Sequence, residues 1–260
     1  MRIVFLTNES FHNDAYFMYQ FSHIASYFDD YWIIAVQKRD STIKFKYTKF
    51  IRKIKYYGFF NFLEILFFYP FQKVLYRLDQ KATNQLINDF VRPIIDIDND
   101  RIINISNSLH SNTTISKLKK VNPDIIIQNG AGILKSEIFS IAKIHTINLH
   151  HGIAPLIRGM SSVYWALWEQ QSSWLGGTVH VINKGIDTGK ILAYSRIKCD
   201  IKKDDYPNLF ASITKEGTKD MLSVLKNLKR DDKFCIKPVA GQSIYKSTFS
   251  GLKLLYLKIK

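Results

Sequence analysis

The stretch INLHHGIAPLIRG, residues 147–159, ends a strand-like apolar run with polar side chains that could act on a carbonyl group. Asn148 and His150 are two residues apart, so on a strand both side chains project from the same face. An amide beside an imidazole can hold a carbonyl and stabilise the negative charge that develops on its oxygen during nucleophilic attack. The imidazole can also exchange a proton near neutral pH.

A second segment, NKGIDTGKIL at residues 183–192, places Asp187 between two glycines. Such a turn lets the backbone approach another loop closely. The carboxylate could orient the His150 ring and accept a proton from an attacking group. Asn148, His150 and Asp187 therefore predict acyl transfer. Each also has a structural reading, because a histidine at a strand end is often hydrogen-bonded core and an aspartate between glycines can be a turn residue.

A metal site is not expected here. His150 and His151 are adjacent, so on a strand they point to opposite faces, and no cysteine or HxxE-type partner lies near them. The two cysteines, Cys199 and Cys235, have no metal or redox spacing, and their scarcity suits a reducing compartment.

The elements that must position these residues alternate between strand and helix patterns up to residue 150. Strands are predicted at 2–6, 31–36, 101–105, 123–129 and 145–150, with helices at 15–28, 113–122 and 136–142. This alternation predicts an α/β fold, a Rossmann-like and mostly parallel sheet flanked by helices. In such sheets ligands bind beyond the carboxyl ends of the strands, which is where the strand at 145–150 places its polar residues.

After that strand, the sequence predicts a helix at 161–171, strands at 176–183 and 189–199, and a long helix at 207–230. The tail at 237–260 has no clear period and is expected to wrap the surface. We expect a catalytic domain over residues 1–200, with residues 201–260 forming a C-terminal helix and tail packed on it.

Residues 41–90 interrupt the alternation and predict a helical insertion. Residues 41–57 carry six basic residues and no acid, an aromatic run follows at 56–71, and a helical pattern continues over 72–91. Its basic and aromatic character could serve a membrane surface or a nucleic acid. The alternative that we favour is a helical hairpin whose aromatic face packs on the sheet or on another subunit, which would make a homodimer.

Bulk composition narrows the choice of partners and compartment. The formal charge of +15 favours anionic partners such as a nucleotide, a nucleic acid or an anionic membrane, without choosing among them. The longest apolar stretch, residues 56–71, is interrupted by Glu64 and Pro70 and is shorter than the roughly 20 residues of a bilayer span. The opening MRIVFLTNES does not resemble a signal peptide. We therefore expect a cytoplasmic protein without stable membrane insertion.

The order and spacing of DIIIQNGAGILKSEIF, INLHHGIAPLIRG and GGTVHVINKGIDTGKIL resemble the formyltransferases that use N10-formyltetrahydrofolate. That family includes glycinamide ribonucleotide, methionyl-tRNA and nucleotide-sugar enzymes. The resemblance implies the formyltransferase fold and a catalytic set of Asn148, His150 and Asp187. In this reading the acceptor's free amine attacks the formyl carbon, Asn148 and His150 steady the oxyanion, and Asp187 relays the proton.

The resemblance also implies where the folate co-substrate binds. The loop at 128–134 would offer backbone groups to the pterin ring, and the stretch around 185–187 would cover its other side. The implied folate contacts are Gln128, Asn129, Gly130, Ala131, Gly132, Ile133, Leu134, Gly185 and Ile186. Candidate acceptor contacts are Asn8, His12, His151, Arg158, Gly159 and Trp165. Stacking in the core is the alternative for Trp165, and His180, which either faces the cleft or is structural, stays outside the catalytic set.

Departures from the family pattern indicate the branch. GIAP replaces the usual Ser-Leu-Leu-Pro after the catalytic histidine, and no glycine-rich phosphate loop of the glycinamide ribonucleotide type follows the first strand. The 73 residues after Asp187 (260 − 187) are too few for the C-terminal domain of the methionyl-tRNA enzymes. The first strand starts at Arg2, without the regulatory domain of the deformylases. The remaining branch formylates nucleotide-linked dideoxy amino sugars for surface polysaccharides such as lipopolysaccharide.

Two alternatives stay open. The acceptor could be water, giving a formyl hydrolase, or a non-sugar amine. A protein of another class would use residues 41–78 to bind a nucleic acid or a membrane on an idle α/β body, with binding weakened by salt and by neutralising Lys53 and Lys55. The intact Asn148, His150 and Asp187 set argues against an idle body, so no nucleic-acid partner is expected.

Overall fold

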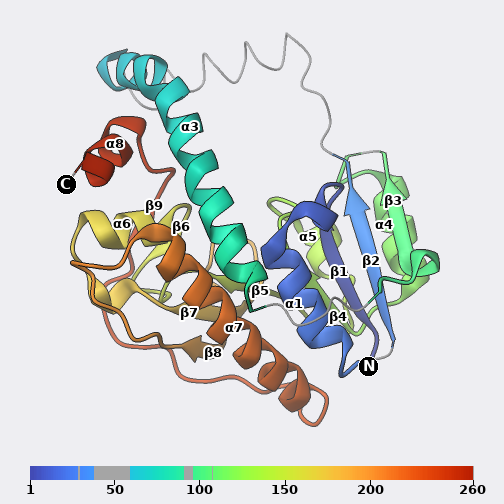
Figure 1. Ribbon diagram of the computed structural model, residues 1–260. Helices are drawn as coiled ribbons and strands as arrows, with labels where there is room; N and C mark the ends of the chain where they lie inside the picture. Colours follow the sequence, from blue (N-terminus) through green and yellow to red (C-terminus); the bar gives the residue numbers. More distant parts are fainter. Residues whose placement is uncertain (29, 38–58, 91–95, 107, 260) are drawn as a thin grey trace.

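The computed structural model describes residues 1–28, 30–37, 59–90, 96–106 and 108–259, with side chains described in the long helix from residue 67 onward. The basic segment at 41–55, for which a membrane or nucleic-acid role was considered, lies outside the described residues. The described parts form the seven-stranded sheet and flanking helices of Figure 1.

The sheet has the strand order β3-β2-β1-β4-β5-β7-β8. The strands are β1 Ile3–Asn8, β2 Tyr31–Val36, β3 Ile102–Ile105, β4 Ile125–Gln128, β5 His145–His150, β7 Gly177–Val181 and β8 Ile191–Ser195. The pairs from β3 to β5 are parallel, whereas β7 is antiparallel to both β5 and β8. The predicted α/β class with a mostly parallel sheet is confirmed.

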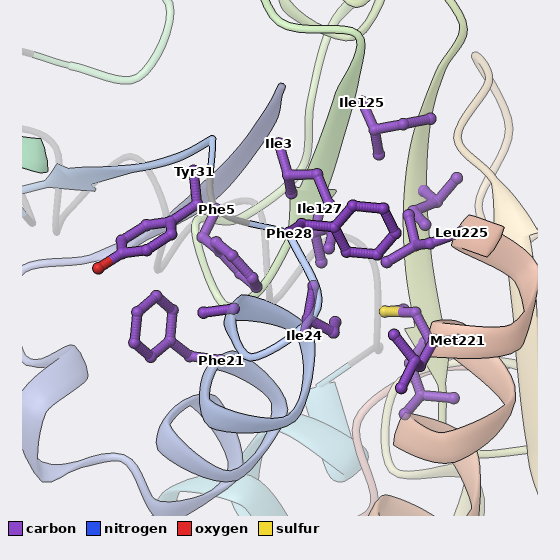
Figure 2. Packing of buried hydrophobic residues seen from close by; sticks show 14 of the residues in the cluster. Ile3, Phe5, Phe21, Ile24, Phe28, Tyr31, Ile125, Ile127, Met221 and Leu225 are labelled. Carbon is purple, nitrogen blue, oxygen red and sulfur yellow. The ribbon is translucent and has the colours of Figure 1, made fainter. Parts of the chain in front are cut away.

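Helices cover both faces of the sheet. One face carries α1 Ala15–Ala25 and α7 Tyr206–Leu228, on which α3 Phe59–Asn88 packs, and the other carries α4 Asn112–Val121 and α5 Ser136–Phe139. Because successive strand residues point to opposite faces, Phe5 enters the first layer and Leu6 the second. Figure 2 shows Phe5 and Phe21 in the first layer, with Met221 and Leu225 of α7 in the same cluster.

Shorter elements complete the carboxyl side of the chain. Helix α6 spans Ser162–Trp168, and strands β6 Arg158–Gly159 and β9 Tyr245–Lys246 form a two-stranded parallel sheet. Helix α8 spans Gly251–Ile259, and three short 3-10 turns lie at Phe11–Asn13, Asn99–Arg101 and Ser172–Trp174. In the described part of the chain, no helix combines the length and apolar character needed to cross a bilayer.

One expectation about local structure is corrected. In α3, the described part of the insertion, Phe67, Tyr69 and Phe71 are exposed, so this aromatic face does not pack on the sheet. The hairpin and the subunit contact stay predictions, because residues 38–58 lie outside the described residues. The tail contributes β9 and α8. The apolar residues of α8 meet their partners on α3 and α6, far away in the sequence, so the tail alone gives no clear period. The boundary at residue 200 stays a prediction.

Helix α8 is fastened to α3 by a buried carboxylate. Asp79 is 4 % exposed, accepts a hydrogen bond from the Tyr164 hydroxyl at 2.6 Å, and forms an ion pair with Lys258 of α8. Two further side chains of α3, Gln72 and Tyr76, donate to the Phe249 carbonyl oxygen at 2.6 and 3.1 Å. These bonds hold the tail against the helix, since a buried polar group left unpaired is costly.

We expect Asp79→Ala to lower the free energy of unfolding by about 2 kcal/mol or more, because the buried Tyr164 hydroxyl and the Lys258 ammonium both lose their acceptor. The matched control is Glu216→Ala, which removes an exposed pair with Lys219 at 2.8 Å and should cost about 0.5 kcal/mol or less. Urea unfolding measures both. Equal losses in the two variants would show that the Asp79 cluster is not an anchor.

Candidate active site

The carboxyl half of β5 presents Asn148 and His150 on one face of the sheet. Ile147 and Leu149 point the other way, into the core that contains α7. The antiparallel register sets His180 of β7 directly opposite Asn148, and their side chains approach to 3.4 Å between Asn148 Nδ2 and His180 Nε2. Three polar side chains therefore project from neighbouring positions of two strands.

Asp187 brings its carboxylate to this group from the loop between β7 and β8. Its Oδ2 lies 3.5 Å from His150 Nδ1 and accepts the Gly159 N–H at 2.9 Å, while its Oδ1 lies 3.4 Å from His180 Nε2. The carboxylate side chain is 14 % exposed. The structure thus brings Asn148, His150 and Asp187 together, with His180 as a fourth member between the amide and the carboxylate.

Backbone geometry supports this approach. Gly159 has φ +96°, and a Cβ there would stand 2.2 Å from the Lys246 carbonyl oxygen of β9. Asp187 itself has φ +51°, a left-handed conformation that few side chains tolerate. Arg158 braces the same loop by donating from Nη1 to the Ile186 carbonyl oxygen at 3.0 Å. The 158–159 segment and the Asp187 loop therefore lie in direct contact.

Both histidines are fixed through one ring nitrogen. His150 Nε2 lies 3.1 Å from the Ile157 carbonyl oxygen, and His180 Nδ1 lies 3.0 Å from that of Val181. A carbonyl oxygen accepts only, so each ring donates from that nitrogen. The other nitrogen of each ring faces Asp187 and donates to its carboxylate whenever it carries a proton. This arrangement has room for a mobile proton among His150, His180 and Asp187.

Electrostatics favour an ionised Asp187 and a neutral His150 at neutral pH. Burial opposes ionisation of Asp187, but the His180 hydrogen bond, the attraction of His150 and the Gly159 N–H outweigh it and lower its pKa to about 2. Burial also lowers the pKa of His150 below its usual 6.5, and the attraction of Asp187 offsets this only in part. An ionised carboxylate beside a neutral imidazole can accept a proton, as a general base must.

The loop after β5 is held beneath the His150 ring. The Thr178 hydroxyl accepts the Ala154 N–H at 3.0 Å and donates to the Gly152 carbonyl oxygen at 2.6 Å. A Cβ on Gly152 would lie 2.7 Å from His150 Nε2 and 3.0 Å from Ser162 Cβ. Glycine at this position leaves the imidazole the space it occupies.

A cavity of about 210 Å³ opens at this end of β5. Its lining includes Asn148, His150, His151, Gly159, Tyr206 and Phe210. A larger cavity of about 600 Å³ is lined by Tyr164, Tyr206 and three lysines, Lys202, Lys203 and Lys258, together with Asp204 and Asp205. Tyr206 lines both cavities. Among the described residues, no group of three or more His, Cys, Asp or Glu side chains is arranged to hold a metal ion.

A family described as formyl transferase matches residues 74–225, which is more than half of the 260 residues. The chain belongs to this family. The match spans β5, β7 and the loop that carries Asp187, so it contains every member of the constellation described above.

The relatives and solved structures to which this chain is similar include formyltransferases named for different acceptors. Methionyl-tRNA formyltransferase of Caldicellulosiruptor saccharolyticus is 33 % identical over 112 residues, which are 43 % of this chain and 35 % of the relative. A 4-N formyltransferase from Francisella tularensis aligns with a TM-score of 0.56 at 14 % identity, over 95 % of this chain and 76 % of that one. HypX from Aquifex aeolicus, in complex with tetrahydrofolic acid, aligns with a TM-score of 0.53 at 14 % identity, over 96 % of this chain and 30 % of that one. This chain spans about a third of the curated relative's length.

The loop proposed to face the folate follows β4, the neighbour of β5, with Gln128 in register with Asn148. Gln128 Nε2 donates to the Gly132 carbonyl oxygen at 3.1 Å, and both Gly130 and Gly132 have positive φ. Asn129 is buried and donates to Gln20 at 2.9 Å, whereas Ile133 is exposed, Ala131 is half-buried and Leu134 is buried in the core. Gly185 and Ile186 lie exposed in the Asp187 loop.

Of the six candidate acceptor contacts, three line the smaller cavity or adjoin Asp187. His151 lines the smaller cavity, stacks on Phe210 with ring centroids 3.9 Å apart, and lies 3.0 Å from the Thr214 hydroxyl. Arg158 and Gly159 adjoin Asp187.

Three other candidates lie further from the constellation. Asn8 accepts the Ser10 N–H, and His12 is exposed against Phe11. Trp165 is buried, donates to the Ser247 carbonyl oxygen at 2.8 Å and packs edge-on against Phe249, the packing considered as its alternative.

His180 is the residue that sequence reasoning left out. In the strand GTVHV, alternation places His180 on the same face as small or polar neighbours. Alternation does not show which side of the sheet that face is on. The deciding signal is the antiparallel register that sets His180 against Asn148, and register is a property of two strands.

His151 should make the folded protein sensitive to acid. Burial, and then the charge of His150, lower the pKa of His151 to about 3. Since this pKa lies below the value near 6.5 in the unfolded chain, the unfolded state binds a proton that the folded state does not bind. Stability therefore falls as pH drops from about 6.5 toward 3, by up to about 1.4 kcal/mol per pH unit.

Urea unfolding of the wild type and His151→Gln between pH 7 and pH 4 measures this slope. Glutamine keeps a polar contact to Thr214 and does not titrate, so the variant should show the shallower slope. Parallel curves would contradict the assignment.

Proposed function

We propose that this formyl transferase moves a formyl group from N10-formyltetrahydrofolate to the amine of a nucleotide-linked dideoxy amino sugar. The observation that carries the proposal is the Asp187 carboxylate held within 3.5 Å of both His150 and His180, with Asn148 beside them and a cavity at the same strand end. This set can position a carbonyl and take up a proton without a metal.

The proposed roles follow from the hydrogen-bonding state of each group. The acceptor amine attacks the formyl carbon, and the Asn148 amide donates to the oxygen that becomes negative. Asp187, ionised and paired with His150, takes the proton that the amine loses. The new C–N bond completes a tetrahedral intermediate. When its oxygen re-forms the carbonyl, the bond from the formyl carbon to the folate nitrogen breaks, and the proton held by Asp187 passes to that nitrogen. His180 holds the Asn148 amide and the Asp187 carboxylate in place.

Folate as the formyl donor is supported by the family and by HypX, whose aligned structure is a complex with tetrahydrofolic acid. In this chain the loop at 128–134 and the exposed Gly185 and Ile186 would hold the donor. The positive φ values of Gly130 and Gly132 shape a turn without side chains at those positions, which suits contact between backbone and a flat ring.

A sugar as the acceptor is supported by the sugar N-formyltransferase from Shewanella sp FDAARGOS_354, whose structure aligns with 95 % of this chain. The smaller cavity would admit the amine-bearing end, and the larger one, which Tyr206 also lines, has room and lysines for the remainder. The product would be a formamido sugar of the kind used in surface polysaccharides such as lipopolysaccharide.

A second candidate acceptor is the amine of methionyl-tRNA, because curated relatives of this chain include methionyl-tRNA formyltransferases. The formal charge of +15 would suit a polyanion. The constellation at Asp187 would act in the same way on either amine, so the acceptor must be found by assay.

The assay incubates the full chain with N10-formyltetrahydrofolate and one of three acceptors: a panel of nucleotide-linked 3- and 4-amino sugars, methionyl-tRNA, or water alone. Mass spectrometry reads the gain of one formyl group, and formate release reports hydrolysis. We expect formylation of an amino sugar, and Asp187→Asn should lower turnover by about a hundredfold or more because the proton acceptor is lost. The exposed Asp89→Asn should match the wild type. Formylation of methionyl-tRNA alone would replace the sugar proposal with the second candidate.

Gly152→Ala tests whether the position of the His150 ring matters for turnover. The added methyl would stand 2.7 Å from His150 Nε2 and displace the ring, so kcat should fall by about tenfold or more for a displacement of a few tenths of an ångström to 1 Å. The control is Gly177→Ala, whose methyl meets only side chains at 3.1 Å or more, on the core side of Leu149. Thermal unfolding shows whether both variants fold. Unchanged kcat in a folded Gly152→Ala protein would remove His150 from the proposed mechanism.

A further inference from the structure

One face of α3 exposes a continuous line of large apolar side chains. Phe67, Phe71, Val74 and Leu78 are spaced four, three and four residues apart, which places them on one side of a helix. Their exposed fractions run from 54 % to 70 %, and Tyr69 on the same turns is also exposed. We call these four residues the α3 stripe.

The other faces of α3 account for its contacts with the rest of the molecule. Leu75 and Tyr76 pack toward α6 and α8, Asp79 anchors Lys258, and Ile87 is buried between α1 and α7. The helix therefore does not need the α3 stripe for its own packing. Exposed apolar side chains that stabilise nothing within the fold are costly in water, and when contiguous they mark an interaction surface.

Exposed apolar residues are concentrated at this end of the molecule. Of thirteen large apolar residues exposed in the described part of the chain, five lie on α3 and three, Leu252, Tyr256 and Ile259, on α8. Figure 1 shows α8 beside the N-terminal half of α3, at the end of α3 that lies away from the seven-stranded sheet. Exposed apolar residues scattered over the surface would not be concentrated on two neighbouring helices.

From residue 67 to residue 80 the exposed charges beside the α3 stripe are of one sign. Lys73 and Arg77 are exposed on the same turns, and the one acidic residue in this range is Asp79, which is buried and paired with Lys258. Helix α8 adds Lys253 and has no acidic residue between 251 and 259. An occupant of this surface must therefore offer apolar groups together with negative charge.

We propose that the α3 stripe docks the protein on the surface of an anionic membrane. An amphipathic helix with aromatic and aliphatic residues on one side and Lys or Arg beside them lies in the headgroup region, without crossing the bilayer. Anionic headgroups add attraction for each nearby lysine or arginine. A second copy of this chain fits less well, because antiparallel α3 stripes would bring Lys73 of both copies together without an exposed acid to offset them.

The docking does not depend on the proposed catalytic function, and its test uses the full chain with vesicles. Vesicles of phosphatidylcholine with and without phosphatidylglycerol are sedimented with the protein at low and high salt. We expect binding to the phosphatidylglycerol vesicles that weakens with salt. Phe71→Gln with Leu78→Gln should reduce binding by about tenfold or more through lost apolar burial. The control Tyr27→Gln, an exposed aromatic outside α3 and α8, should bind as the wild type does.

A second pair of variants separates local from overall charge. Lys73→Gln with Arg77→Gln should weaken binding by about tenfold, whereas Lys119→Gln with Lys120→Gln, an equal charge change at the exposed end of α4, should have a much smaller effect. Equal weakening by the two charge pairs, or unchanged binding of Phe71→Gln with Leu78→Gln, would overturn the proposal. So would a dimer in sedimentation velocity that dissociates on Phe71→Gln with Leu78→Gln, because the stripe would then be a subunit interface. Thermal unfolding confirms that each variant is folded.

Discussion

The buried carboxylate of Asp187 is the constraint on which the geometry of the site depends. Removing a carboxylate from water is unfavourable unless donors surround it. The donors and partners here come from three separate segments: His150 at the end of β5, His180 on β7 and the Gly159 N–H on β6. Stabilising this one charge therefore requires β5, β7 and the 158–159 segment to converge, and the pairing of β6 with β9 holds the third of these in position.

The change from parallel to antiparallel pairing at β7 is what makes convergence possible. A parallel neighbour of β5 needs a long crossover connection, whereas the antiparallel β7–β8 pair is joined by a short loop. The chain leaves β7 beside β5, where the Ile182 N–H donates to the Thr146 carbonyl oxygen at 2.7 Å, and then returns far enough to set Asp187 against His150. Glycines on both sides of Asp187 permit that return.

Local patterns in the sequence were sufficient for the strands of the large sheet and for the main helices, because periodicity and turn residues are encoded within a few neighbours. The grouping of Asn148, His150 and Asp187 came from the order and spacing of three motifs along the chain. Three features were not local. The place of His180 depends on the register between β5 and β7. The exposure of Phe67 and Phe71 depends on which face of α3 meets α7 and α8, and composition alone made an aromatic core reading reasonable. In helix α8, Leu254 is buried and Leu252 is exposed. The helices that pack on α8 decide which of its apolar residues are buried, so this pattern cannot be read from the tail alone.

The hydrogen-bonding states at the site also explain why an amine suits the proposed reaction. His150 and His180 each donate a hydrogen bond to a main-chain carbonyl oxygen, so the remaining nitrogen of each ring and the Asp187 carboxylate can share an added proton. A ligand with N–H groups can supply that proton. As the amine attacks, its proton can enter the Asp187–His150 pair and reduce the negative charge there while the formyl oxygen gains negative charge beside Asn148. The negative charge lost at the Asp187–His150 pair offsets the negative charge gained on the formyl oxygen. The net charge of the low-dielectric site therefore stays constant during the reaction.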